Sequence, residues 1–142
     1  MDSATGRQVV RADKGRGAKG TRMLWNAILV GAGGFLGAMA RYFVSEWYAK
    51  KVVSPIPLGT LTVNLLGCFL LGLLAGRRAD TQLLMFMGVG FFGAFTTFST
   101  FKLESHQMLA GKRWLLFIVY TLSSYLIGIF LGLAGYMIGL LL

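Results

Sequence analysis

Four hydroxyl side chains occupy five consecutive positions of an otherwise apolar stretch, at Thr96, Thr97, Ser99 and Thr100. Glycines precede this cluster, the last of them at Gly93. A single Ser or Thr in a membrane helix often donates back to the carbonyl four residues earlier. A cluster that follows glycines instead indicates an interrupted helix, whose free carbonyls can hold a small cation such as Na⁺.

Two aromatic residues lie inside the same stretch. Phe98 and Phe101 are three positions apart and therefore share one face of a helix. Ordinary packing is one interpretation of this pair. The other uses the positive edge of the aromatic ring, which can meet an anion without the full charge that would hold it too tightly for conduction.

Uncharged polar residues recur in two further apolar segments. Thr60 and Asn64 are four positions apart, as are Tyr120 and Ser124, so each pair shares a helix face. Asn64 either bonds to a neighbouring helix or offers its N–H groups to a polar path. Uncharged donors can replace the water around a small, strongly hydrated anion, whereas a drug cation would require a carboxylate in mid-span. The pattern favours a small anion.

Four long apolar segments must position these residues, at 23–44, 57–76, 82–101 and 113–142. Each is long enough to cross a bilayer, which takes about 20 residues. The chain is only 13% charged, against about 25% in soluble domains. Glycine pairs four positions apart, such as Gly33 and Gly37, indicate close helix packing. These features predict an all-α membrane protein with four transmembrane helices, the third broken near its middle.

The first 22 residues differ in composition from the rest. They are rich in glycine and basic residues, with few apolar residues and no sustained helical period, which predicts a disordered segment at 1–22 before a four-helix membrane domain at 23–142. The formal net charge of +9 can suggest nucleic acid. A basic segment beside membrane spans is more typical of contact with anionic lipid or of a topology signal, so no nucleic-acid partner is expected.

The basic residues give no clear topology. With four spans, the basic segment and the loop at Arg77 and Arg78 share one side. The loop with Lys50 and Lys51 and the loop with Lys102, Lys112 and Arg113 lie on the other side. Small proteins with so weak a bias can insert in both orientations and pair antiparallel. The alternative, in which the basic segment fixes one orientation, stays open.

Several classes of chemistry lack the residues they need. The chain has one cysteine, Cys68, and one histidine, His106, so neither an internal disulfide nor a zinc site is expected. No paired carboxylates and no base for a serine are present, so we do not expect an enzyme.

Four segments carry a resemblance to a known family. "GGFLGAMARY" (33–42), "GTLTVNLLG" (59–67), "GAFTTFSTFKLE" (93–104) and "YTLSS" (120–124) resemble the signature segments of the Fluc/CrcB fluoride channels. The resemblance extends from about Met23 to the C-terminus and leaves out the basic segment. It is specific because the segments occur together and in this order.

The resemblance implies a fluoride-selective channel that gives passive efflux of cytoplasmic fluoride across the plasma (inner) membrane and so protects against fluoride toxicity. It also implies an antiparallel, dual-topology homodimer with two pores and a structural Na⁺ at the dimer interface. The residues that it places in the fluoride pore are Asn64, Phe98, Phe101, Ser99, Thr100, Tyr120, Ser124 and Thr60. Arg41 would lie near the aqueous vestibule, and Gly93 and Thr96 would supply backbone carbonyls to Na⁺.

Two features depart from that family. Ala94 follows Gly93 where the family often has a second glycine. Because carbonyl ligation does not use the side chain, we expect Na⁺ binding to survive. The basic segment is the second departure, and it can bias insertion toward one orientation.

Two other functions compete with a channel. A proton-coupled exporter of cations needs a membrane-embedded acid, and the sequence predicts that Glu46 and Glu104 lie at span ends. A non-transporting membrane scaffold would explain the glycine packing but not the polar and aromatic constellation.

Overall fold

The computed structural model describes the backbone of residues 3–142 and the side chains of residues 19–142. Its helices are α1 (Ser3–Lys51), α2 (Leu58–Gly76), α3 (Thr81–Leu83), the π-helix η1 (Leu84–Phe92), α4 (Gly93–Phe95), α5 (Phe98–Ala110) and α6 (Trp114–Leu141). Among the described residues, four helical segments are long and apolar enough to cross a membrane: Lys19–Lys51, Leu58–Gly76, Thr81–Ala110 and Trp114–Leu141. The predicted four-span, all-α architecture is confirmed.

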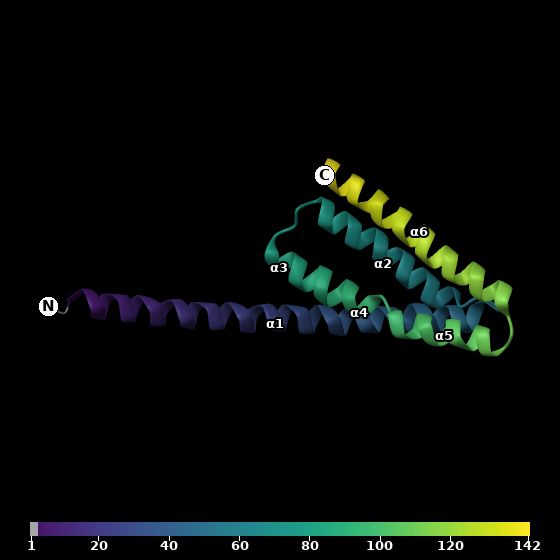
Figure 1. Ribbon diagram of the computed structural model, residues 1–142, viewed down its shortest axis with the longest axis horizontal. Coiled ribbons are helices and arrows are strands. Elements are labelled where there is room, and N and C mark those ends of the chain that lie inside the picture. The colour runs from purple at the N-terminus through teal and green to yellow at the C-terminus, as the bar shows by residue number, and fades with distance from the viewer. Residues whose placement is uncertain (1–2) are drawn as a thin grey trace.

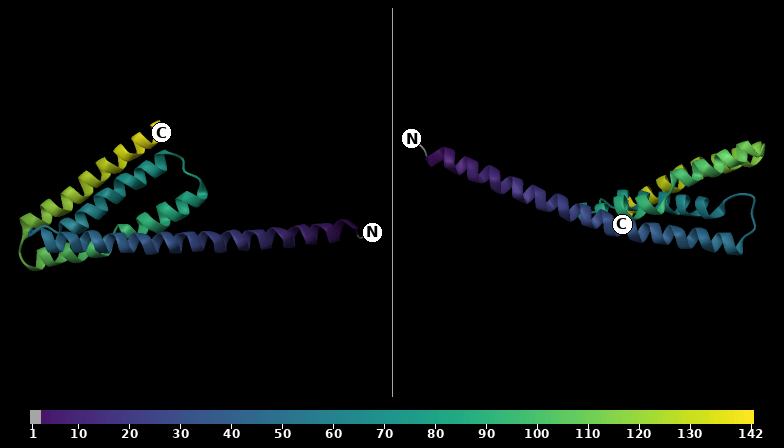
Figure 2. Two further views of the ribbon diagram at one scale, coloured as in Figure 1. Left: turned by 180° about the vertical axis from the view of Figure 1, so that it is seen from behind. Right: turned by 90° about the horizontal axis from the view of Figure 1, so that it is seen from below.

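The spans pack in two pairs. Helix α2 runs beside α6, and the segment from α3 to α4 lies along α1 (Figure 1). The connections after α1 and after α5 lie at one end of the bundle, which we call the Lys50 end. The connection after α2, called the Arg77 end, lies opposite, and both views in Figure 2 show α1 extending beyond the bundle on that side.

Helix α1 begins well before residue 23, the predicted start of the first span. From Ser3 onward the backbone of the basic segment is part of α1, and the disorder that its composition indicates stays a prediction. No proline interrupts the segment, and its Ala, Arg and Lys residues favour helix. The division of the chain into two parts at residue 22 stays a prediction.

Glycines allow close backbone contact within both pairs of spans. A Cβ atom at Gly33 or Gly37 of α1 would overlap the carbonyl oxygens of Phe86 and Phe91. A Cβ atom at Gly72 of α2 would overlap the Gly132 carbonyl oxygen of α6 in the same way. The close packing at paired glycines that the sequence predicts therefore occurs in both pairs of spans.

The third span is longer than the sequence predicts. Asp80 caps its start by accepting a 2.8 Å hydrogen bond from the Leu83 N–H. Its end is at Ala110 rather than at Phe101, so the predicted boundary was wrong. The prediction ended the span at the first charged residues, but the helix continues to Ala110, with Gly111 as its C-cap and Lys112 at a positive φ of 57° in the turn that follows. Lys102 and Glu104 consequently lie inside the span.

Candidate functional site

The third span is broken at two residues near its middle. Helix α4 ends at Phe95 and α5 begins at Phe98, while Thr96 (φ −78°, ψ 157°) and Thr97 (φ −145°, ψ 121°) are extended. Thr97 caps α5, because its Oγ1 accepts a 3.3 Å hydrogen bond from the Thr100 N–H. The predicted break is confirmed, and it falls inside the hydroxyl cluster.

Asn64 of α2 completes the backbone hydrogen bonding at this break. Its Nδ2 donates to the Thr97 carbonyl at 3.0 Å, and its Oδ1 accepts from the Thr97 N–H at 2.8 Å. In an unbroken helix that N–H would donate to the Gly93 carbonyl. The structural interpretation of Asn64 is thus realised, and its second amide hydrogen is left for another acceptor.

The hydroxyl groups around the break are connected. Thr97 Oγ1 lies 3.0 Å from Thr100 Oγ1 and 3.4 Å from Ser99 Oγ. Thr97 is buried, whereas Ser99 and Thr100 are exposed on the surface of the single chain. Thr96 differs, since its hydroxyl donates back to the Phe92 carbonyl at 2.9 Å.

A cavity of about 300 Å³ adjoins the break. Its lining includes five of the predicted site residues, namely Asn64, Phe98, Phe101 and Ser124 of the predicted pore and Thr96 of the predicted Na⁺ site. The rings of Phe98 and Phe101 have centroids 6.2 Å apart. Phe98 is 65% exposed and Phe101 only 6%, so the two rings have different roles in packing.

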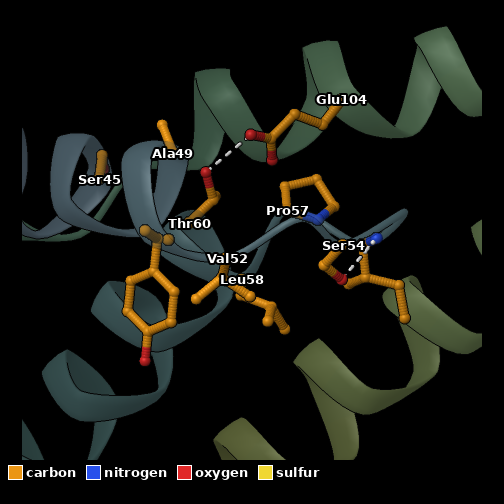
Figure 3. Close-up of a pocket in the computed structure, with 11 residues that line it drawn as sticks. Ser45, Ala49, Val52, Ser54, Pro57, Leu58, Thr60 and Glu104 are labelled. Carbon is orange, nitrogen blue, oxygen red and sulfur yellow. Dashed lines mark hydrogen bonds between the residues drawn. The ribbon is translucent and has the colours of Figure 1, made fainter.

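A second polar cluster lies toward the Lys50 end. Glu104 of α5 accepts a 2.8 Å hydrogen bond from the Thr60 hydroxyl and a 2.7 Å hydrogen bond from the Tyr120 hydroxyl, one on each carboxylate oxygen. Figure 3 shows the Thr60–Glu104 bond at the edge of a pocket of about 220 Å³ that Ser45 also lines. The carboxylate thus orients two hydroxyls that the sequence placed in the site.

Tyr120 and Ser124 serve different clusters despite their common helix face. The Ser124 hydroxyl donates to the Tyr120 carbonyl at 2.7 Å and lines the cavity beside Asn64. The buried Tyr120 hydroxyl reaches Glu104 instead. Phe101 connects the two clusters, because it lines the cavity and its ring centroid lies 5.2 Å from that of Tyr120.

Sequence reasoning missed two residues of this site. Thr97 holds Asn64 through its backbone, and its place directly before a helical run is an N-cap signal. Glu104 was placed at a span end, although its spacing of three from Phe101 puts both on one face of α5. Glu104 lies six positions before the end of the third helical span, so the expectation that both acids lie at span ends, which counted against an exporter, was wrong for Glu104.

Backbone oxygens are the groups at the break that suit a cation. The Gly93 carbonyl is not the acceptor of the Thr97 N–H, and Gly93 is exposed. The Thr96 carbonyl accepts one long hydrogen bond, 3.5 Å from Arg41 Nη1. No cluster of three or more His, Cys, Asp or Glu side chains that could hold a metal exists among the described residues.

The fold and the site define a small multi-pass membrane protein with a polar break in its third span. The family described as "CrcB-like protein, Camphor Resistance (CrcB)" matches residues 28–136, and the chain belongs to this family.

Relatives of known name agree with this assignment. The chain is 51% identical over 117 residues to "Fluoride-specific ion channel FluC 1" of Geobacillus kaustophilus (82% of this chain, 99% of the relative). It is 42% identical over 113 residues to a "Fluoride-specific ion channel FluC 2" of Bacillus cereus (80% and 96%). It is 43% identical over 121 residues to "Fluoride-specific ion channel FluC 2" of Moorella thermoacetica (81% and 95%). These relatives are ion channels by name, not enzymes.

Proposed function

We propose that this protein is a fluoride-selective channel of the plasma (inner) membrane, through which cytoplasmic fluoride leaves passively. One observation carries the proposal: Asn64, Ser124, Phe98 and Phe101 line one cavity at a helix break. The names of the relatives support fluoride as the anion.

The cavity can replace the water around a small anion with fixed groups. The second amide hydrogen of Asn64 is a donor, since the first is used by the Thr97 carbonyl. The Phe98 and Phe101 rings offer positive edges, which attract an anion without trapping it. Ser99 and Thr100 extend a line of hydroxyls from Thr97.

Toward the Lys50 end, the anion meets the hydroxyls of Thr60 and Tyr120. Both hydrogens now point at Glu104. Fluoride that accepts a hydrogen bond from either hydroxyl replaces the Glu104 carboxylate as the acceptor. Each hydroxyl therefore always donates to an acceptor, either fluoride or Glu104. Such exchange keeps binding weak enough for release.

An antiparallel homodimer of dual topology fits the exposed surface of the single chain. Phe98 is 65% exposed beside the cavity, as expected if a second copy completes each pore. Basic residues flank both ends of the bundle, with Arg77 and Arg78 at one end and Lys50, Lys51, Lys112 and Arg113 at the other. Neither orientation is strongly excluded by the positive-inside rule.

A structural Na⁺ at the interface fits the backbone of the break. The carbonyls of Gly93 and Thr96 would hold it, because the break frees the first from the Thr97 N–H and leaves the second with one long contact to Arg41. Ala94 lies within α4, before the break, and ligation by backbone carbonyls does not use its side chain. When bound, the ion supplies the positive charge that joins the carbonyls of two copies.

Fluoride efflux from liposomes tests the function. The purified protein is reconstituted in KF-loaded liposomes, and external fluoride is followed with an electrode after valinomycin is added. We expect rapid release that depends on valinomycin, and none with chloride as the loaded anion. No release from folded protein supplied with Na⁺ would contradict the proposal, and valinomycin-independent uptake of lipophilic cations driven by a proton gradient would favour the exporter.

A further inference from the structure

Lys102 lies within a candidate membrane span and has no charged partner among the side chains of residues 19–142. It lies about one turn into α5, within the Thr81–Ala110 span, and its side chain is exposed. Eight residues separate it from the end of the span, or about 12 Å of helix. Charged residues at such positions usually face a protein cavity or a water-filled path rather than lipid.

The acidic residues with described side chains all have other partners. Glu46 pairs with Lys50 at 2.8 Å, Asp80 caps the Leu83 N–H, and both oxygens of Glu104 are taken by hydroxyls. Within residues 19–142, therefore, no carboxylate neutralises Lys102.

The ring of Phe98 is the partner that Lys102 does have. The Lys102 Nζ lies 5.7 Å from the ring centroid, within the range of a cation–π contact. That ring lines the cavity beside Asn64. A cation over its face leaves the ring edges free and adds positive potential near the cavity.

We propose that Lys102 is an anion-attracting residue of the channel, which raises the local fluoride concentration at the Phe98 ring without binding the ion. This inference rests on the proposed fluoride channel. Lys102 is not among the residues that line the cavity, and its ammonium group contacts the Phe98 ring instead, so it steers the anion but does not trap it as a direct ligand would.

Flux through charge variants tests the assignment. Lys102→Met should lower fluoride efflux about tenfold at low ionic strength, with a smaller deficit at high salt, because screening weakens steering. Lys102→Arg should keep most of the flux. Lys112→Met is the matched control, since it makes the same change in the turn after α5, and its flux should stay near wild type.

Chemical modification tests charge independently of side-chain shape. In a Cys68→Ala background, the Lys102→Cys variant is treated with a cationic or an anionic methanethiosulfonate reagent, and modification is checked by mass spectrometry. The cationic adduct should restore flux and the anionic adduct should lower it further, relative to unmodified Lys102→Cys protein. Equal effects of the two adducts, or unchanged flux in Lys102→Met beside an active wild type, would show that Lys102 only reaches to the membrane surface and would overturn this inference alone. An inactive wild type would overturn the channel itself.

Discussion

Asn64 and Thr97 exchange two hydrogen bonds across 33 positions of sequence, with the Asn64 amide replacing the backbone partner that the helix break removes. The same side chain lines the cavity. One residue thus stabilises the break and presents a donor beside it.

Replacing Asn64 with Ser should reduce both stability and flux. The shorter side chain cannot reach both backbone groups of Thr97, and each unsatisfied group costs about 1–3 kcal/mol. We expect a lower melting temperature in detergent and strongly reduced fluoride efflux, with the proposed dimer intact by size-exclusion chromatography. Gln82→Ala, an exposed change near the start of the third span, is the control. Undiminished efflux in the Asn64 variant would remove it from the pore.

Substitutions of Phe98 and Phe101 should differ in how much they lower the stability of the fold. Phe101 is 6% exposed and Phe98 is 65% exposed, so Phe101→Ala should cost about 3–5 kcal/mol of stability and Phe98→Ala much less. Phe98→Ile should lower fluoride flux while thermal unfolding stays near wild type. Loss of stability in the Phe98 variant equal to that of the Phe101 variant would contradict the separation.

Glu104 and Tyr120 should be energetically coupled. In Glu104→Gln only one acceptor oxygen remains for two hydroxyls, so the hydrogen of either Tyr120 or Thr60 loses its acceptor, at a cost of about 1–3 kcal/mol. Tyr120→Phe added to Glu104→Gln should recover part of this loss. A double-mutant cycle on unfolding free energies measures the coupling, and strictly additive effects would mean that the hydrogen bond contributes nothing.

Gly67 should tolerate no side chain. A Cβ atom there would overlap the methyl group of Thr96, so Gly67→Ala should displace the break and reduce flux. Gly128→Ala serves as the comparison, because its Cβ would meet Cys68 Sγ at an ordinary 3.6 Å. Equal fluoride efflux from the two variants would show that the position of Thr96 is not critical.

Removal of residues 1–22 should shift membrane orientation. With that segment gone, the basic residues of the loops at the Lys50 end outnumber Arg77 and Arg78 at the opposite end. The positive-inside rule then favours the Lys50 end on the cytoplasmic side. Cysteines introduced at each end and labelled by an impermeant reagent in intact cells measure the two populations. An unchanged labelling ratio would mean that the segment does not take part in setting orientation.

The sequence by itself determined the four spans, the position of the break and the glycine crossings. Each depends on local composition: runs of apolar residues long enough for a bilayer, hydroxyl residues clustered after glycine, and glycines spaced one helical turn apart. These signals lie within a single helix and can be read without knowing its neighbours.

Only the tertiary structure decided which polar groups meet. Asn64 reaches Thr97, and Glu104 accepts from Thr60, 44 positions away. Tyr120 and Ser124 share a helix face in the sequence, yet their hydroxyls serve different clusters, because Tyr120 reaches Glu104 of α5 whereas Ser124 donates to the Tyr120 carbonyl of its own helix and lines the cavity. The third span continued past Lys102 for the same reason. A charged residue ends an apolar run, but a helix with side-chain partners on its neighbours has no need to end there.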